Sequence, residues 1–270
     1  MNKMNRYAFS TAALYPLASE AALELIGKAG FGYAELMPQA FSDVGDDFAE
    51  RALKTGVRVG SVHYPLAMFG MLYTSHPAMM EEGRIFSRKV VRLCRMLGAG
   101  ILVVHPHVPS SPQYREILEE PVLKNLLYVA DLCRENNITM AIENSPKGSG
   151  NTGDGLLGYI NSLGSHPAIR PMVDTTEACE AFQNPAGFIK TVRPAHVHLS
   201  DHKSELKHLP AGQGSIDWNA VKDALAFTGY TGYYTLEPSY RYYLEDIENR
   251  LKDAFRFISN LIGGTGMEHI

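Results

Sequence analysis

The stretch Ile101-Leu-Val-Val-His105 is the most strand-like run of this chain. Its apolar residues do not alternate with polar ones, which is typical of a strand buried on both faces in a parallel sheet. A long helical pattern, from about Pro77 to Leu97, precedes the run and ends at Gly98. A helix followed by a doubly buried strand indicates an α/β fold.

Seven further runs read as strands, and helical patterns separate most of them. The eight predicted strands are Tyr7–Ser10, Tyr33–Met37, Val57–His63, Ile101–His105, Thr139–Asn144, Ile169–Thr175, Ala195–Leu199 and Tyr233–Glu237. The predicted helices are Ser19–Ala29, Asp46–Thr55, Pro77–Leu97, Glu119–Asn136, Asp217–Thr228 and Leu244–Ile262, with a short helix entered from the Gly-rich segment Lys147–Gly158.

The alternation of strands and helices predicts right-handed βαβ units in a parallel sheet. Eight such units fit the usual TIM-barrel length of about 250 residues. We therefore predict a single (β/α)8 TIM barrel that forms one domain over residues 1–270. The alternative is a doubly wound open sheet, which usually carries a Gly-x-Gly-x-x-Gly turn after its first strand. This chain has Ser10-Thr-Ala-Ala13 at that place.

Composition and charge argue against nucleic acid and membranes as binding partners of this protein. The net charge of −4 and the pI of about 6.2 give no sign of a surface for nucleic acid or anionic membranes. No run approaches the roughly 18 apolar residues of a membrane span. The three cysteines form no Cys-x-x-Cys pair, which fits reduced thiols. We expect a cytoplasmic protein that binds neither nucleic acid nor a membrane.

Four predicted strands end in a side chain that can bind a metal. These side chains are Glu143, Asp174, His198 and Glu237. Alone, each carboxylate could equally be a helix cap or a loop charge. In a barrel, however, the carboxyl ends of all strands converge on one mouth. Three oxygens and one nitrogen suit one divalent cation such as Mn²⁺, Mg²⁺, Co²⁺ or Zn²⁺.

Other polar residues near strand ends are candidates for substrate contact. His63 and His105 end the third and fourth strands, where substrate contact or a second metal competes with simple polar lining. Glu35 ends the second strand and would need a partner inside a barrel. Lys203 could hold a substrate hydroxyl or phosphate, or be a solvated lysine. His208 precedes a Gly-containing turn that lets its loop fold back to the mouth.

An ordered set of motifs resembles the xylose isomerase-like TIM-barrel superfamily, especially its sugar phosphate isomerase/epimerase branch, to which endonuclease IV is related. The matching pieces are Glu35-Leu, Val-His105-Pro, Ala-Ile-Glu143-Asn, Val-Asp174-Thr, His196-Val-His198-Leu-Ser-Asp201, Leu-Pro-Ala-Gly-Gln-Gly214-Ser-Ile-Asp-Trp218 and Leu-Glu237-Pro. The resemblance implies that Glu143, Asp174, His198 and Glu237 are the metal ligands. It also implies that Glu143 and Glu237 carry the proton transfers.

The chain departs from the family pattern at three places. Glu177 stands where epimerases and endonuclease IV usually have a histidine, and we assign it to substrate binding. Ser204 replaces an arginine of the sugar epimerases, and Leu206 replaces an aspartate that endonuclease IV needs for its third zinc. The departures, and the shortage of positive charge for a phosphate backbone, make DNA repair a minor alternative.

We expect a metal-dependent isomerase or epimerase of a sugar, sugar phosphate or polyol-ketone. It would work by carboxylate proton transfer through a metal-stabilised enediolate. The alternatives are a dehydratase or lyase on the same scaffold, an endonuclease IV-like phosphodiesterase, and a non-catalytic sugar-binding barrel. A second metal on His63, His105 and Glu143 is a further option. A homo-oligomer is an expectation that comes with the resemblance.

Overall fold

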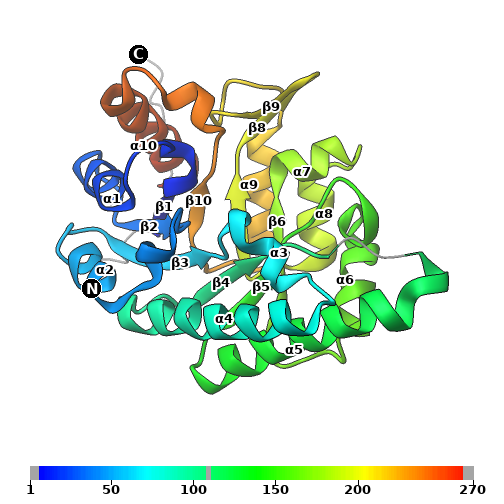
Figure 1. Cartoon of the computed structure of the whole chain (residues 1–270). Coiled ribbons are helices and arrows are strands. Elements are labelled where there is room, and N and C mark those ends of the chain that lie inside the picture. Colours follow the sequence, from blue (N-terminus) through cyan, green and yellow to red (C-terminus); the bar gives the residue numbers. More distant parts are fainter. Residues whose placement is uncertain (1–5, 108–110, 264–270) are drawn as a thin grey trace, which may run out of the picture.

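Eight parallel strands close into a barrel in the computed structural model, which describes residues 6–107 and 111–263. The order around the barrel is β1-β10-β7-β6-β5-β4-β3-β2 (Figure 1). The barrel strands are β1 (Tyr7–Ser10), β2 (Tyr33–Leu36), β3 (Arg58–His63), β4 (Ile101–Val104), β5 (Thr139–Ile142), β6 (Ile169–Asp174), β7 (His196–Leu199) and β10 (Tyr234–Leu236). The predicted (β/α)8 TIM barrel is confirmed, while the domain limits of 1–270 stay a prediction.

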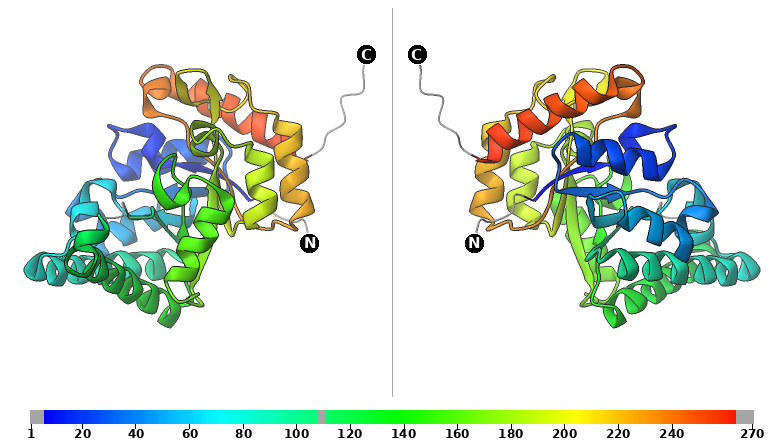
Figure 2. Two further views of the ribbon diagram at one scale, coloured as in Figure 1. Left: turned by 90° about the vertical axis from the view of Figure 1, so that its right-hand side faces the viewer. Right: turned by 90° about the vertical axis from the view of Figure 1, so that its left-hand side faces the viewer.

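Helices surround the barrel. They are α1 (Ser19–Lys28), α2 (Asp46–Leu53), α3 (Phe69–Leu72), α4 (Pro77–Leu97), α5 (Glu120–Glu135), α6 (Gly153–Ser162), α7 (Thr175–Glu180), α8 (Pro185–Val192), α9 (Trp218–Phe227) and α10 (Ile247–Gly263). The long helices α4 and α5 pack against each other along one side of the barrel (Figure 2). Over the described ranges, no helix has both the length and the apolar character to cross a membrane.

Three parts of the structure were not among the predicted elements. Helix α3 lies in the connection after β3, and α7 and α8 lie between β6 and β7. Helix α7 starts where Asp174 accepts the Glu177 N–H at 2.8 Å, and Asn184 caps α8 in the same way through the Gly187 N–H. The third part is an antiparallel hairpin of β8 (Asp201–Lys203) and β9 (Leu206–Leu209).

Strand β4 shows why an unbroken apolar run was the right signal for this fold. Leu102 and Val104 belong to the main core, which includes residues of the surrounding helices. Ile101 and Val103 form a separate cluster with Ala141 and Met172, and Tyr233 packs against it. Because Ala141 precedes the mouth residue Glu143 by two positions, this second cluster fills the barrel interior below the mouth.

The bottom of the barrel is closed by a contact that only glycine permits. A Cβ atom at Gly60 would lie 2.6 Å from the Tyr233 ring. That ring is held on its other sides by Tyr33, at 4.8 Å between centroids, and by the Arg6 guanidinium, at 5.5 Å. Hence the ring has little freedom to move away.

We expect Gly60→Ala to lower the free energy of unfolding by about 1–3 kcal/mol, because the added methyl overpacks the barrel floor. Gly100 is a matched control, since its N–H donates to Gly60 O at 3.2 Å and its own Cβ position is open. Gly100→Ala should change stability by about 0.5 kcal/mol or less. Denaturant titration measures both variants, and equal losses would contradict the steric argument.

Candidate metal centre

The four predicted metal ligands meet at the barrel mouth. Glu143 follows β5, Asp174 ends β6, His198 lies in β7 and Glu237 follows β10. One ligand atom from each lies within 4.8 Å of the others. Asp174 and His198 are register partners on neighbouring strands, so the sheet itself sets their spacing. The arrangement could hold one divalent cation.

His198 is the centre of this group. Its Nδ1 atom lies 3.0 Å from Glu143 Oε1 and 2.6 Å from Glu237 Oε2. Its Nε2 atom lies 2.8 Å from Glu35 Oε1, on the other side of the ring. Burial favours the neutral imidazole, but the charges of Glu237, Glu35 and Glu143 outweigh it and raise the pKa of His198 well above its usual value.

One carboxylate oxygen at the mouth, Asp174 Oδ2, is buried without a hydrogen-bond partner among the described residues. Burial, together with the nearby Glu143 and Glu177, raises the pKa of Asp174 to about 8. A buried carboxylate without a partner is costly, and a bound cation removes that cost. The donor set therefore fits a divalent metal that prefers oxygen with one imidazole.

A second group shares Glu143 with the first. His105 Nε2 lies 2.9 Å from Glu143 Oε2, and His63 Nε2 lies 3.6 Å from the same oxygen. The two imidazole Nε2 atoms are 3.2 Å apart, and Tyr64 O lies 2.7 Å from His63 Nδ1. These three side chains could hold a second cation next to the first.

Glu35 lies beneath His198 and does not line the mouth cavity. Its side chain is fully buried, and Oε2 accepts hydrogen bonds from Ser61 Oγ at 2.7 Å and from His196 Nε2 at 2.8 Å. Such contacts fix the orientation of a metal-binding histidine. Substrate contact by Glu35 stays a prediction, and its geometry fits the support of His198 better.

His208 and Glu177 both reach the mouth. His208 Nε2 lies 3.4 Å from Glu177 Oε1, and His208 Nδ1 lies 3.2 Å from Ser200 Oγ. His208 thus returns to the site from β9, as the sequence predicted for its loop. Lys203 is exposed on the hairpin and is not among the residues that line the cavity.

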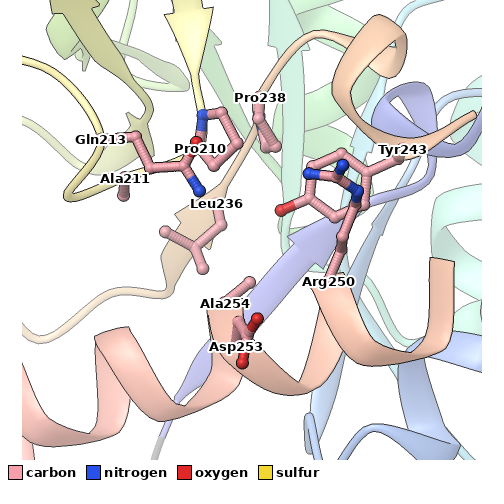
Figure 3. A pocket seen from close by; sticks show the side chains of 9 residues that line it. All are labelled: Pro210, Ala211, Gln213, Leu236, Pro238, Tyr243, Arg250, Asp253 and Ala254. Atoms are coloured by element: carbon pink, nitrogen blue, oxygen red, sulfur yellow. The ribbon is translucent and has the colours of Figure 1, made fainter. Parts of the chain in front are cut away.

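The cavity above the four candidate ligands has a volume of about 300 Å³. It is lined by Ala12, Met37, His63, Leu66, His105, Glu143, Glu177, His208, Glu237, Pro238, Ser239 and Tyr240. A smaller cavity of about 80 Å³ lies between α10 and the end of β10 (Figure 3). The smaller cavity contains none of the candidate ligands, whereas Glu143 and Glu237 line the mouth cavity.

The family follows from a comparison with known families. A family model described as the xylose isomerase-like TIM barrel matches residues 23–261. The chain belongs to this family. The resemblance that the motifs indicated is therefore confirmed.

Relatives and solved structures agree with this membership. The uncharacterized protein ML2432 of Mycobacterium leprae is 26% identical over 268 residues, which cover 88% of this chain and 90% of the relative. The crystal structure of 3-keto-D-glucoside 4-epimerase YcjR from E. coli has a TM-score of 0.76 at 17% identity and covers 95% of this chain and 99% of its own. A structure of L-ribulose 3-epimerase also has a TM-score of 0.76, at 20% identity, covering 96% of this chain and 95% of its own. At these identities the two structures show the fold.

Within this family member, serines complete the site. Ser10 Oγ donates to Glu237 Oε1 at 2.8 Å, and Ser61 Oγ donates to Glu35. Sequence reasoning missed both as functional residues. A signal was present, because Ser10 ends the first predicted strand and Ser61 lies two residues before His63 on one strand face.

Asp201 determines where the hairpin and the following loop lie. Its buried carboxylate accepts the N–H groups of His202, Gly212 and Ile216, and the Nε1–H of Trp218 at 2.8 Å. The Asp201 carboxylate thereby connects the start of the β8–β9 hairpin, which carries His208, to the loop that follows the hairpin.

We expect Asp201→Asn to lower the free energy of unfolding by about 2–3 kcal/mol, because the new amide places N–H groups against N–H donors. Asp217→Asn is the matched control. Asp217 caps α9 through the Ala220 N–H at 3.0 Å, and asparagine caps equally well. Thermal or denaturant unfolding compares the two. An equal effect of both substitutions would contradict the role given to Asp201.

Proposed function

We propose that this protein is a metal-dependent epimerase or isomerase of a hydroxy-carbonyl sugar or polyol. The observation that carries the proposal is the meeting of three carboxylates and His198 at one point of the mouth, where the buried Asp174 Oδ2 has no hydrogen-bond partner among the described residues. The epimerases among the structures with the same fold support this reading. The three free cysteines support a cytoplasmic location.

The residues proposed to hold the metal are Glu143, Asp174, His198 through Nδ1, and Glu237. A divalent cation bound there supplies Lewis-acid polarisation of a substrate carbonyl. Glu35 keeps His198 in place from the opposite side of its ring. His63 and His105 contact substrate or, with Glu143, hold a second cation.

Glu143 and Glu237 are proposed to transfer the proton at the carbon next to the carbonyl. They come from strands on opposite sides of β7 in the barrel order, so they approach the site from two directions. Burial opposes ionisation of Glu143, but His198 and His105 outweigh it and hold the pKa of Glu143 well below its usual range. Glu143 is thus ionised, which is the state that a proton acceptor needs. Ser10 fixes Glu237.

The stereochemical outcome depends on how the two glutamates share the proton. Return of a proton to the opposite face of the same carbon gives epimerisation. Transfer to the adjacent carbon gives aldose–ketose isomerisation. The competing lyase reaction follows the same first step, but a hydroxyl group on the next carbon then leaves as water.

Metal binding tests the proposed ligands without any substrate. Chelator-treated protein should bind Mn²⁺ or Zn²⁺ in calorimetry, and Asp174→Asn should weaken binding by more than about 100-fold. Glu35→Gln should weaken it by about 10- to 100-fold, because it loosens His198. Glu205→Gln, at an exposed hairpin residue, should leave binding unchanged. Unaltered affinity in Asp174→Asn would remove that residue from the metal site.

Proton exchange tests the reaction. In heavy water, the metal-loaded protein should place deuterium into one member of a panel of keto-sugars and polyol-ketones. Glu143→Gln and Glu237→Gln should each lower the rate by about 10²- to 10⁴-fold while the fold is kept. Mass spectrometry follows the exchange, and ultraviolet absorbance would reveal an enone if the lyase reaction dominates. No exchange with any compound would favour a binding protein.

A further inference from the structure

We infer that the substrate of this site is an uncharged carbohydrate with an apolar substituent at the end away from the reacting carbon. The inference rests on the proposed function and adds the class of substrate. Two independent features of the mouth cavity lead to it. One is the sign of its charges, and the other is the division of its wall into a polar side and an apolar side.

Among the described residues, the cavity is lined by no lysine or arginine that could receive a phosphate or carboxylate. Of its twelve lining residues none is lysine or arginine, while Glu143, Glu177 and Glu237 are carboxylates. Asp174 adds a fourth carboxylate below them. A divalent cation offsets only part of this charge. Sites for anionic substrates in proteins instead use arginine, lysine or free backbone N–H groups.

Two cationic residues near the mouth have partners outside the cavity. Lys207 pairs with Glu180 on the outside of the hairpin. Arg250 lines the separate small cavity (Figure 3). Its Nε–H donates to Glu245 O at 3.1 Å. Neither reaches the cavity that holds the candidate ligands.

Two further groups that could attract an anion already have partners within the protein. The Glu177 N–H in the first turn of α7 is taken by Asp174 Oδ1 at 2.8 Å. The His208 ring lies between Glu177 Oε1, at 3.4 Å, and Asp174 Oδ2, at 3.9 Å. An anion would have to compete with carboxylates for both groups, which disfavours sugar phosphates and sugar acids.

One side of the cavity is apolar. Met37, Leu66 and Tyr240 line it, and Leu66 and Tyr240 remain 48% and 36% exposed. Tyr15 stands beside Tyr240 with 5.3 Å between ring centroids and is 47% exposed. These residues follow β10, β1, β2 and β3, which are four consecutive strands of the barrel. The carboxylates Glu143, Asp174 and Glu177 come from the opposite strands β5 and β6 or directly follow them, while Glu237 follows β10.

This division assigns each end of the substrate to a wall. The reacting carbonyl and hydroxyl groups face the carboxylates and histidines. An alkyl or aryl group, such as the aglycone of a glycoside, covers the exposed faces of Leu66 and Tyr240 and removes them from water. A sugar without such a group leaves Leu66 and Tyr240 exposed to water, and its binding affinity is lower.

Matched substrate pairs test the charge argument. The metal-loaded protein is offered a keto-sugar and its 6-phosphate, with turnover followed by deuterium exchange and binding by calorimetry. We expect kcat/KM and affinity for the phosphate to be lower by about tenfold or more. A preferred phosphate would overturn the inference while the proposed function stands. Absence of exchange with every compound, together with absence of binding, would overturn both.

Rim variants test the apolar wall. Leu66→Ser combined with Tyr240→Ser should raise KM for a keto-sugar alkyl glycoside by about fivefold to tenfold more than for the parent sugar, because the alkyl group loses its contact surface. Leu244→Ser is the control, since Leu244 is 55% exposed just beyond this turn and does not line the cavity. Equal KM changes for both substrates in the rim variant would overturn the assignment of this wall.

Discussion

The placement of one imidazole among three carboxylates is the constraint on which this structure depends. His198 contacts Glu143 and Glu237 through one nitrogen and Glu35 through the other. Three carboxylates this close repel one another unless positive charge lies between them. The protonated ring supplies that charge inside the protein, and a metal that displaces the proton would supply it more strongly. Metal binding and proton release are thereby linked at one side chain.

The barrel and the convergence of the candidate ligands could be predicted because both follow from local rules. An unbroken apolar run such as Ile101–Val104 indicates a doubly buried strand, and parallel strands bring their carboxyl ends together. The polar residue that follows such a run therefore points to the mouth without knowledge of any loop. Glu143, Asp174 and Glu237 could be found in this way.

The parts that escaped prediction depend on contacts between distant residues. Nothing local to Asp201 indicates that its carboxylate will bind the backbone of Gly212 and Ile216. The position of the hairpin, and with it that of His208, depends on these hydrogen bonds between residues far apart in the sequence. Helices α7 and α8 are short. Each begins with a side-chain cap, Asp174 or Asn184, at a place where the sequence indicated only a strand end or a loop. The exposed Leu66 and Tyr240 carried no sequence signal at all.

Asp174 belongs to two structures at once. One oxygen accepts the N–H that starts helix α7, while the other is left for the mouth. The same side chain therefore starts a helix and faces the proposed ion site. Because Glu177 lies in the first turn of that helix, replacing Asp174 would remove the cap that positions Glu177 as well as a candidate ligand.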